Sequence, residues 1–191
     1  PAKFGVSAYS TVLVPDWIGS LGGFRECAAL LGRAPDGRLP VLTVVDRSRI
    51  DSGLVSAGDL YPVSVVGVDD IDNWTGLDRH AYAARKSAWL DAIVGRLDEE
   101  WPGFGASVAV REMSTAQSMH EHLGTPRGAV YGFAPHVPAN PLSPAGHSGE
   151  TSVPGLYLAS AFGGFGGFSG AMGAGAVAVR TALRDGRQIG R

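Results

Sequence analysis

Charged residues are scarce in this chain. Lys, Arg, Asp and Glu make up 18% of its 191 residues, and the formal net charge is −2. Such a balance provides no basic surface for nucleic acid. With 45% hydrophobic residues, the composition is still that of a globular protein long enough to bury a core.

Cysteine is nearly absent too, since Cys27 is the only one and no disulfide can form within the chain. A lone cysteine in an apolar segment fits a reducing compartment, so we expect a structural thiol in a cytoplasmic protein. No basic segment followed by an apolar run opens the sequence, which therefore shows no secretory signal. The first residue is Pro1, and loss of an initiator Met, an expression scar and cleavage from a precursor all stay open.

Charge is missing altogether from one long stretch, between Glu150 and Arg180. Its eight glycines between Gly155 and Gly175 oppose a membrane helix, because each costs about 1 kcal/mol in a helix interior. We therefore expect no transmembrane span.

Metal-ligand and hydrolase signatures are also lacking. The five histidines have no ligand spacing, and His120 and His122 point to different sides of a helix because they are two residues apart. No G-x-S-x-G elbow occurs, and Ser169 in Gly-Phe-Ser-Gly is the nearest approach to one. We expect no metal site, and no side chain stands out as an acid or base.

The hydrophobic patterns that are present predict an α+β fold. Alternating or β-branched runs predict strands at 3–14, 39–46, 61–68, 107–112 and 129–133. Helices are expected over 78–99, where apolar residues recur every four positions, and over 114–122, while 18–31 is mixed or helical. We divide the chain into a domain over 1–133 and a C-terminal part over 134–191 that begins with a Pro-, Gly- and Ser-rich loop.

The C-terminal part contains a glycine-rich strand-loop-helix. An apolar strand over 156–159 enters a loop of Gly-Gly-Phe repeats, and a helix of small residues leaves it. Such a loop brings backbone N–H groups and the positive end of a helix up to an anionic or electron-rich ligand. The spacing fails the dinucleotide fingerprint, because Ser169 stands where the glycines at 164 and 166 require a third. Too few residues follow for the second strand of a βαβ unit.

Two interpretations of this loop stay open: one wall of a nucleotide-cofactor site, or a tight turn that lets a helix pack on a sheet. Aromatic residues flank the loop at Tyr131, Phe133, Tyr157, Phe162, Phe165 and Phe168. They fit a pocket for a flat or long apolar ligand and the core of a small domain equally well. For the pocket we name Tyr131, Phe133 and Phe165.

A series of motifs then carries a family resemblance. In chain order these are Asp51–Leu60, Trp74–Asp78, Tyr82–Lys86, Trp101–Gly103, Arg111–Thr115, Gly124–Gly132, Val153–Leu158 and Gly167–Met172. The series resembles the C-terminal portion of phytoene desaturase-like flavoproteins, particularly the carotenoid isomerase and retinol saturase branch. The resemblance covers nearly the whole chain, and the closing motif is its most specific part.

The resemblance implies a two-domain FAD-dependent oxidoreductase. Residues 1–133 would form a substrate-binding domain, with a sheet and a long helix, and 134–191 would return to a Rossmann-like FAD-binding domain. The residues implied at the isoalloxazine are Gly167, Phe168, Ser169, Gly170, Ala171 and Met172, and those near the ribityl-pyrophosphate are Ser160, Ala161 and Phe162. Positive N–H density beside the flavin stabilises its anionic reduced form and so favours hydride acceptance.

Two features depart from the family pattern. The G-x-G-x-x-G loop of the N-terminal βαβ unit is absent, and Ser160 stands where the family has glycine, so that an added Cβ crowds the approach to the cofactor. We therefore expect the C-terminal subunit or fragment of a split FAD-dependent oxidoreductase, with a companion chain that supplies the G-x-G-x-x-G half. Its substrate would be apolar or conjugated, and the reaction a desaturation, saturation or isomerisation. The alternative is a non-catalytic scaffold or partner subunit that kept the fold but lost flavin contact.

Overall fold

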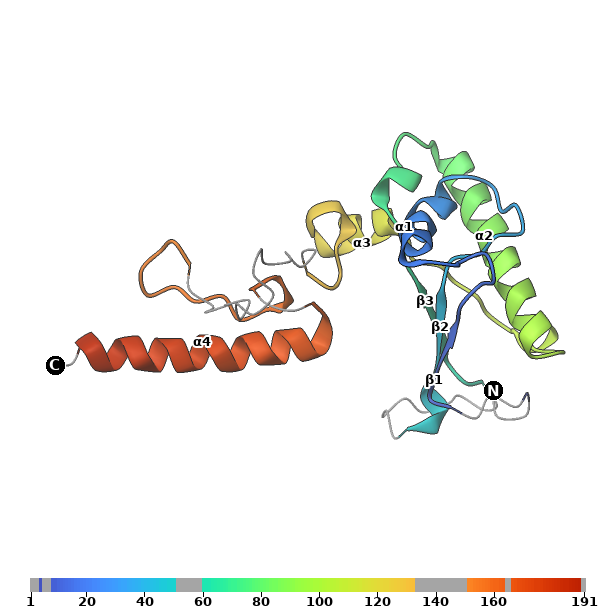
Figure 1. Cartoon of the computed structure of the whole chain (residues 1–191). Helices are drawn as coiled ribbons and strands as arrows, with labels where there is room; N and C mark the ends of the chain where they lie inside the picture. The colour runs from blue at the N-terminus through green and yellow to red at the C-terminus, as the bar shows by residue number, and fades with distance from the viewer. Residues whose placement is uncertain (1–3, 5–7, 51–59, 133–150, 164–165, 190–191) are drawn as a thin grey trace. The chain divides into compact units, whose positions relative to one another are not determined.

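The computed structural model of the chain describes residues 4, 8–50, 60–132, 151–163 and 166–189 (Figure 1). It divides the chain into two compact units, Pro1–His122 and Leu123–Arg191. The chain mixes helices with an antiparallel sheet. The functional division at residue 133 and the Rossmann-like character of the C-terminal part stay predictions.

The first unit is built on a three-stranded antiparallel sheet of β1 (Ser10–Leu13), β2 (Leu42–Asp46) and β3 (Val63–Gly67), in that order. In the register of the sheet, Val44 at the centre of β2 lies between Thr11 and Val65. The strands expected within 3–14, 39–46 and 61–68 are thus confirmed, with shorter bounds.

Helices α1 (Leu21–Ala29), α2 (Arg79–Glu100) and α3 (Ala116–Leu123) complete this unit. The long helix is confirmed, and it begins where the Asp78 carboxylate accepts a hydrogen bond from the N–H of Ala81 at 2.8 Å. Helix α2 runs along one face of the sheet (Figure 1). The buried residues of this sheet–helix core are Leu13, Leu42, Val44, Leu97, Trp101 and Phe104.

A second core cluster lies beside the middle and the amino-terminal half of α2, where Trp89 is completely buried and packs with Trp74, Leu30 and Leu31. The indole N–H of Trp89 donates to the carbonyl of Arg33 at 2.8 Å, so its polar atom is satisfied. Cys27 is also completely buried, which agrees with a structural thiol.

Short 3-10 helices join the larger elements: η2 (Leu30–Gly32), η3 (Arg47–Arg49), η4 (Ile71–Asn73), η5 (Gly105–Ser107), η6 (Pro126–Gly128) and η7 (Ala161–Gly163). The strands predicted at 107–112 and 129–133 are wrong for the described residues of both segments, which form no strand. In the segment 107–112, Val108 packs against the core but Val110 is 84% exposed, so the alternating residues do not share one buried face.

The second unit contains helix α4 (Gly167–Ile189), with the segment 151–163 alongside it (Figure 1). The phenol of Tyr157 donates to the Asp185 carboxylate at 2.7 Å and ties this segment to the helix. The strand predicted at 156–159 does not form: Tyr157 makes a single β-bridge, and the other three residues belong to no strand. The buried side of α4 carries small residues: Gly170, Ala174, Ala178 and Thr181.

Candidate functional site

The amino end of α4 is fixed by the main chain of a neighbouring segment. Its first residue, Gly167, has a φ of 79°, which favours glycine, and its N–H donates to the carbonyl of Tyr131 at 3.0 Å. A Cβ on Gly166 would lie 2.5 Å from the same carbonyl oxygen. Residues 166 and 167 can approach Tyr131 this closely because both are glycines.

The next residues of α4 present backbone donors. The N–H groups in the first turn of a helix have no acceptor within the helix, and here these include Phe168 and Ser169. Within the described part of the chain, no backbone carbonyl outside the helix accepts a hydrogen bond from either of these two N–H groups. The helix dipole adds partial positive charge at this end. This arrangement suits the electron-rich or anionic edge of a ligand.

Large exposed apolar side chains follow one side of α4, beginning at this end of the helix. Phe168 is 86% exposed and Met172 is 76% exposed, and Val179 and Leu183 follow at 58% each. We call these four residues the outer stripe of α4. Apolar side chains this exposed, on the side opposite the buried small residues, are typical of a surface that meets another molecule.

Residues 160–163 form the other side of the arrangement. The Ser160 hydroxyl accepts a hydrogen bond from the N–H of Phe162 at 3.1 Å and so holds the start of η7. Gly132 has a φ of 101°, and a Cβ there would lie 2.3 Å from the carbonyl oxygen of Ala161. The pair Tyr131–Gly132 is therefore in backbone contact with both η7 and the start of α4.

The structure thus brings together Ser160, Ala161 and Phe162 with the start of α4, as well as Tyr131. Apart from being glycines near the loop, Gly132 and Gly166 carry no sequence signal that marks them as the residues that permit this contact. Phe133 and Phe165, predicted for the substrate pocket, lie outside the described residues. Flavin contact and a substrate pocket at these residues stay predictions.

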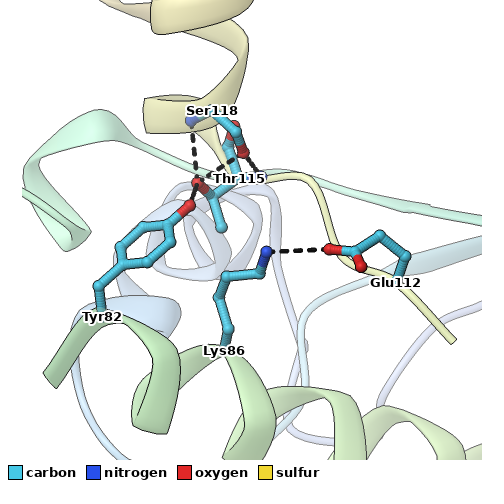
Figure 2. A network of polar contacts seen from close by, with 5 residues as sticks. All are labelled: Tyr82, Lys86, Glu112, Thr115 and Ser118. Atoms are coloured by element: carbon cyan, nitrogen blue, oxygen red, sulfur yellow. Dashed lines mark hydrogen bonds and ion pairs between the residues drawn. The ribbon is translucent and has the colours of Figure 1, made fainter. Parts of the chain in front are cut away.

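The first unit contains a network of polar side chains that joins α2 to α3 (Figure 2). The hydroxyls of Tyr82 and Thr115 lie 2.8 Å apart, and Thr115 is 1% exposed. Thr115 and Ser118 each accept a hydrogen bond from the other's backbone N–H, at 3.2 and 2.6 Å, which is the reciprocal pattern of a capping box. Nearby, Lys86 pairs with Glu112 at 3.1 Å and holds the pKa of that carboxyl below its usual value.

The Asp69 carboxylate, at the amino end of α3, accepts a second set of hydrogen bonds. One oxygen of Asp69 accepts from the Trp74 indole and from the N–H of Ala116, both at 2.8 Å. The other oxygen accepts from the side-chain amide of Asn73, also at 2.8 Å. Sequence reasoning missed this role of Asp69, which depends on residues 47 positions apart meeting in space. Both networks serve the positioning of α3.

In the described residues, no group of three or more His, Cys, Asp or Glu side chains is placed to hold a metal ion. No helix in that part of the chain combines the length and the apolar character needed to cross a bilayer.

Comparison with known proteins finds a similarity to an isomerase. Over 113 residues the chain is 29% identical to the chloroplastic prolycopene isomerase of Daucus carota. The match covers 56% of this chain and 17% of that relative, so the chain spans only a small part of the relative's length. No protein-family model and no solved structure matches the chain. The similarity supports a distant relationship to a carotenoid isomerase, in agreement with the motifs of the sequence.

Proposed function

We propose that this chain is the C-terminal portion of an FAD-dependent oxidoreductase acting on an apolar or conjugated substrate, with a companion polypeptide supplying the Rossmann half. The similarity to prolycopene isomerase is the observation that carries the proposal. The start of α4 supports it independently, because it offers backbone donors and a positive helix end.

The residues present fit a flavin. The first-turn N–H groups of Phe168 and Ser169 suit the electron-rich pyrimidine edge of an isoalloxazine. Exposed Phe168 and Met172 would cover apolar parts of the bound molecules and exclude water. The residues that would hold the cofactor are thus those at the start of α4, with Ser160, Ala161 and Phe162 toward its ribityl-pyrophosphate.

When bound, the flavin supplies hydride transfer to or from a carbon skeleton, as in desaturation, saturation or isomerisation. The protein's part is to bind and orient. Donors at the start of α4 would favour the charge of the anionic reduced state, and they need no side-chain acid or base to do so. The nucleotide end of FAD needs a G-x-G-x-x-G loop, which this sequence lacks and which we assign to the companion.

The outer stripe of α4 provides a direct test. The wild-type chain and its Phe168→Asp variant are each purified together with a polypeptide that carries the G-x-G-x-x-G fingerprint. The wild-type pair should give a yellow complex with bound FAD. The variant should keep the folding stability of the chain, because Phe168 is 86% exposed, but should lose most of the complex.

Val110→Asp is the matched control, because Val110 is 84% exposed and lies in the first unit. It should leave complex formation unchanged. A wild-type pair without flavin absorbance, or equal loss of the complex in both variants, would contradict the proposal.

The alternative, a non-catalytic partner subunit, is favoured by one observation. The Ser160 hydroxyl accepts a hydrogen bond from the N–H of Phe162 at 3.1 Å, and Ser160 stands at the position where the family it resembles has glycine. Ser160→Gly removes both this hydrogen bond and the Cβ. In a flavin-binding complex the change should alter the affinity for FAD, whereas in a scaffold it should change nothing about FAD.

A further inference from the structure

We infer that Tyr131 is a positioning residue of the cofactor site, with its ring forming a wall beside the start of α4 against which the isoalloxazine lies. The inference rests on the proposed function and deepens it. It places Tyr131, expected in the substrate pocket, on the cofactor side.

The backbone of Tyr131 is held from two directions. Its carbonyl accepts the Gly167 N–H at 3.0 Å. The following residue, Gly132, approaches Ala161 so closely that a Cβ would lie 2.3 Å from the Ala161 carbonyl oxygen. Both contacts are made by main-chain atoms, so they remain when the Tyr131 side chain is changed.

The ring itself lies against the helix start. A Cβ on Gly167 would lie 3.3 Å from Cδ1 of Tyr131 and 3.7 Å from Cε1. One edge of the ring thus faces Gly167, yet the residue is 54% exposed. A rigid aromatic side chain held in place by its own backbone, with half of its surface open, is pre-organised to contact a flat ligand at little entropic cost.

The neighbouring groups indicate which ligand part the ring meets. The N–H groups of Phe168 and Ser169 belong to the same first turn that the ring borders. A ring system that accepts hydrogen bonds from these donors through its polar edge therefore lies within reach of Tyr131. An isoalloxazine has such an edge, whereas a hydrocarbon substrate has none.

Contact with an electron-rich phenol ring favours an electron-poor partner. The oxidised flavin is poorer in electrons than the reduced flavin, so Tyr131 stabilises the oxidised state more. Its removal should weaken FAD binding and raise the midpoint potential of the bound flavin. A tenfold change in the ratio of the two affinities corresponds to about 30 mV for a two-electron couple.

The experiment uses the chain in complex with its companion, loaded with FAD, as wild type and as Tyr131→Ala, Tyr131→Leu and Tyr131→Phe. We expect about a tenfold weaker affinity for FAD in the Ala and Leu variants, together with a changed visible spectrum and a raised potential. Phe should restore the wild-type values within about twofold, because the ring is kept. Leu keeps apolar bulk at the position and so separates loss of the ring from loss of packing.

Tyr61→Ala is the matched control, since Tyr61 is 53% exposed and lies in the first unit. It should change neither affinity nor potential. If the wild-type complex binds FAD and the Ala and Leu variants match it in affinity and potential, the inference on Tyr131 is overturned and the proposed function stands. If the Phe variant behaves as Ala does, the ring is not the active part and the inference is likewise overturned. A wild-type complex that binds no FAD overturns both.

Discussion

The phenol of Tyr157 donates a hydrogen bond to the carboxylate of Asp185 at 2.7 Å, across 28 positions of sequence. This bond fastens the segment 151–163 to the last turns of α4. The Tyr157 hydroxyl, and after it Arg184, hold the pKa of the Asp185 carboxyl below its ordinary value of 3.8.

Acid should therefore loosen this attachment. A carboxyl with a lowered pKa in the folded state contributes stability above its unfolded pKa and loses it as the pH falls through the folded value. Protection factors for the amides of 151–163, which correct hydrogen exchange for its intrinsic dependence on pH, should be high at neutral pH and fall below the ordinary pKa of 3.8. Tyr157→Phe should exchange faster at neutral pH and show less change in acid. Tyr9→Phe, at a 40% exposed position of the first unit, is the control, and a Tyr157→Phe profile equal to wild type would refute the attachment.

Gly132→Ala should destabilise the second unit. The left-handed φ of 101° costs roughly 1–2 kcal/mol for alanine, and the clash with the Ala161 carbonyl adds about 1–3 kcal/mol. Denaturant unfolding of the variant measures the sum. Gly155→Ala is the matched control, because Gly155 has a φ of 79° with open space around its Cβ position. It should show the backbone penalty alone, and equal losses in the two variants would mean that the contact is absent.

Asp69→Asn should destabilise the first unit by about 2–4 kcal/mol, because an amide N–H₂ replaces an oxygen that accepts from buried donors. If the amide nitrogen takes the place of one oxygen, the Trp74 indole and the N–H of Ala116 lose their acceptor. If it takes the place of the other, the side-chain amide of Asn73 loses its acceptor. Urea unfolding followed by tryptophan fluorescence measures the loss. Asp16→Asn, at an exposed turn, should stay within about 0.5 kcal/mol of wild type. A similarly small effect at Asp69 would show that the carboxylate does not organise α3.

Thr115→Ala should shorten α3 from its amino end. It removes the hydroxyl that accepts the Ser118 N–H and leaves the Tyr82 hydroxyl without this partner. We expect a loss of about 1–2 kcal/mol, the usual range for an N-cap residue. Thr115→Ser keeps the hydroxyl and should retain most of the stability. Exchange protection in α3 is the measurement, and equal protection in the Ala and Ser variants would contradict the capping role.

Patterns that a segment completes by itself were predicted well. The helix expected at 78–99 is α2, because its cap residue Asp78 and its apolar spacing lie within the segment and Pro102–Gly103, which disfavour further helix, follow it directly. The strands expected at 107–112 and 129–133 failed, because alternation is local while a strand needs a partner and a surface to bury against. For the candidate site, the sequence predicted a glycine-rich loop followed by a helix, which is the start of α4. The closeness of Tyr131 was not predicted, because 36 positions separate it from Gly167.

The sequence by itself determined the composition of a charge-poor globular chain, the long helix, the three strands of the first unit and the glycine-rich start of α4, because each follows from residues near one another. Only the tertiary structure decided which main-chain atoms meet: the Tyr131 carbonyl with the Gly167 N–H, and the Asp69 carboxylate with the N–H of Ala116. The physical reason is that a donor or an acceptor has no preferred partner along the chain. Packing of distant segments selects the partner, and glycines at 132, 166 and 167 allow the backbones to come close enough.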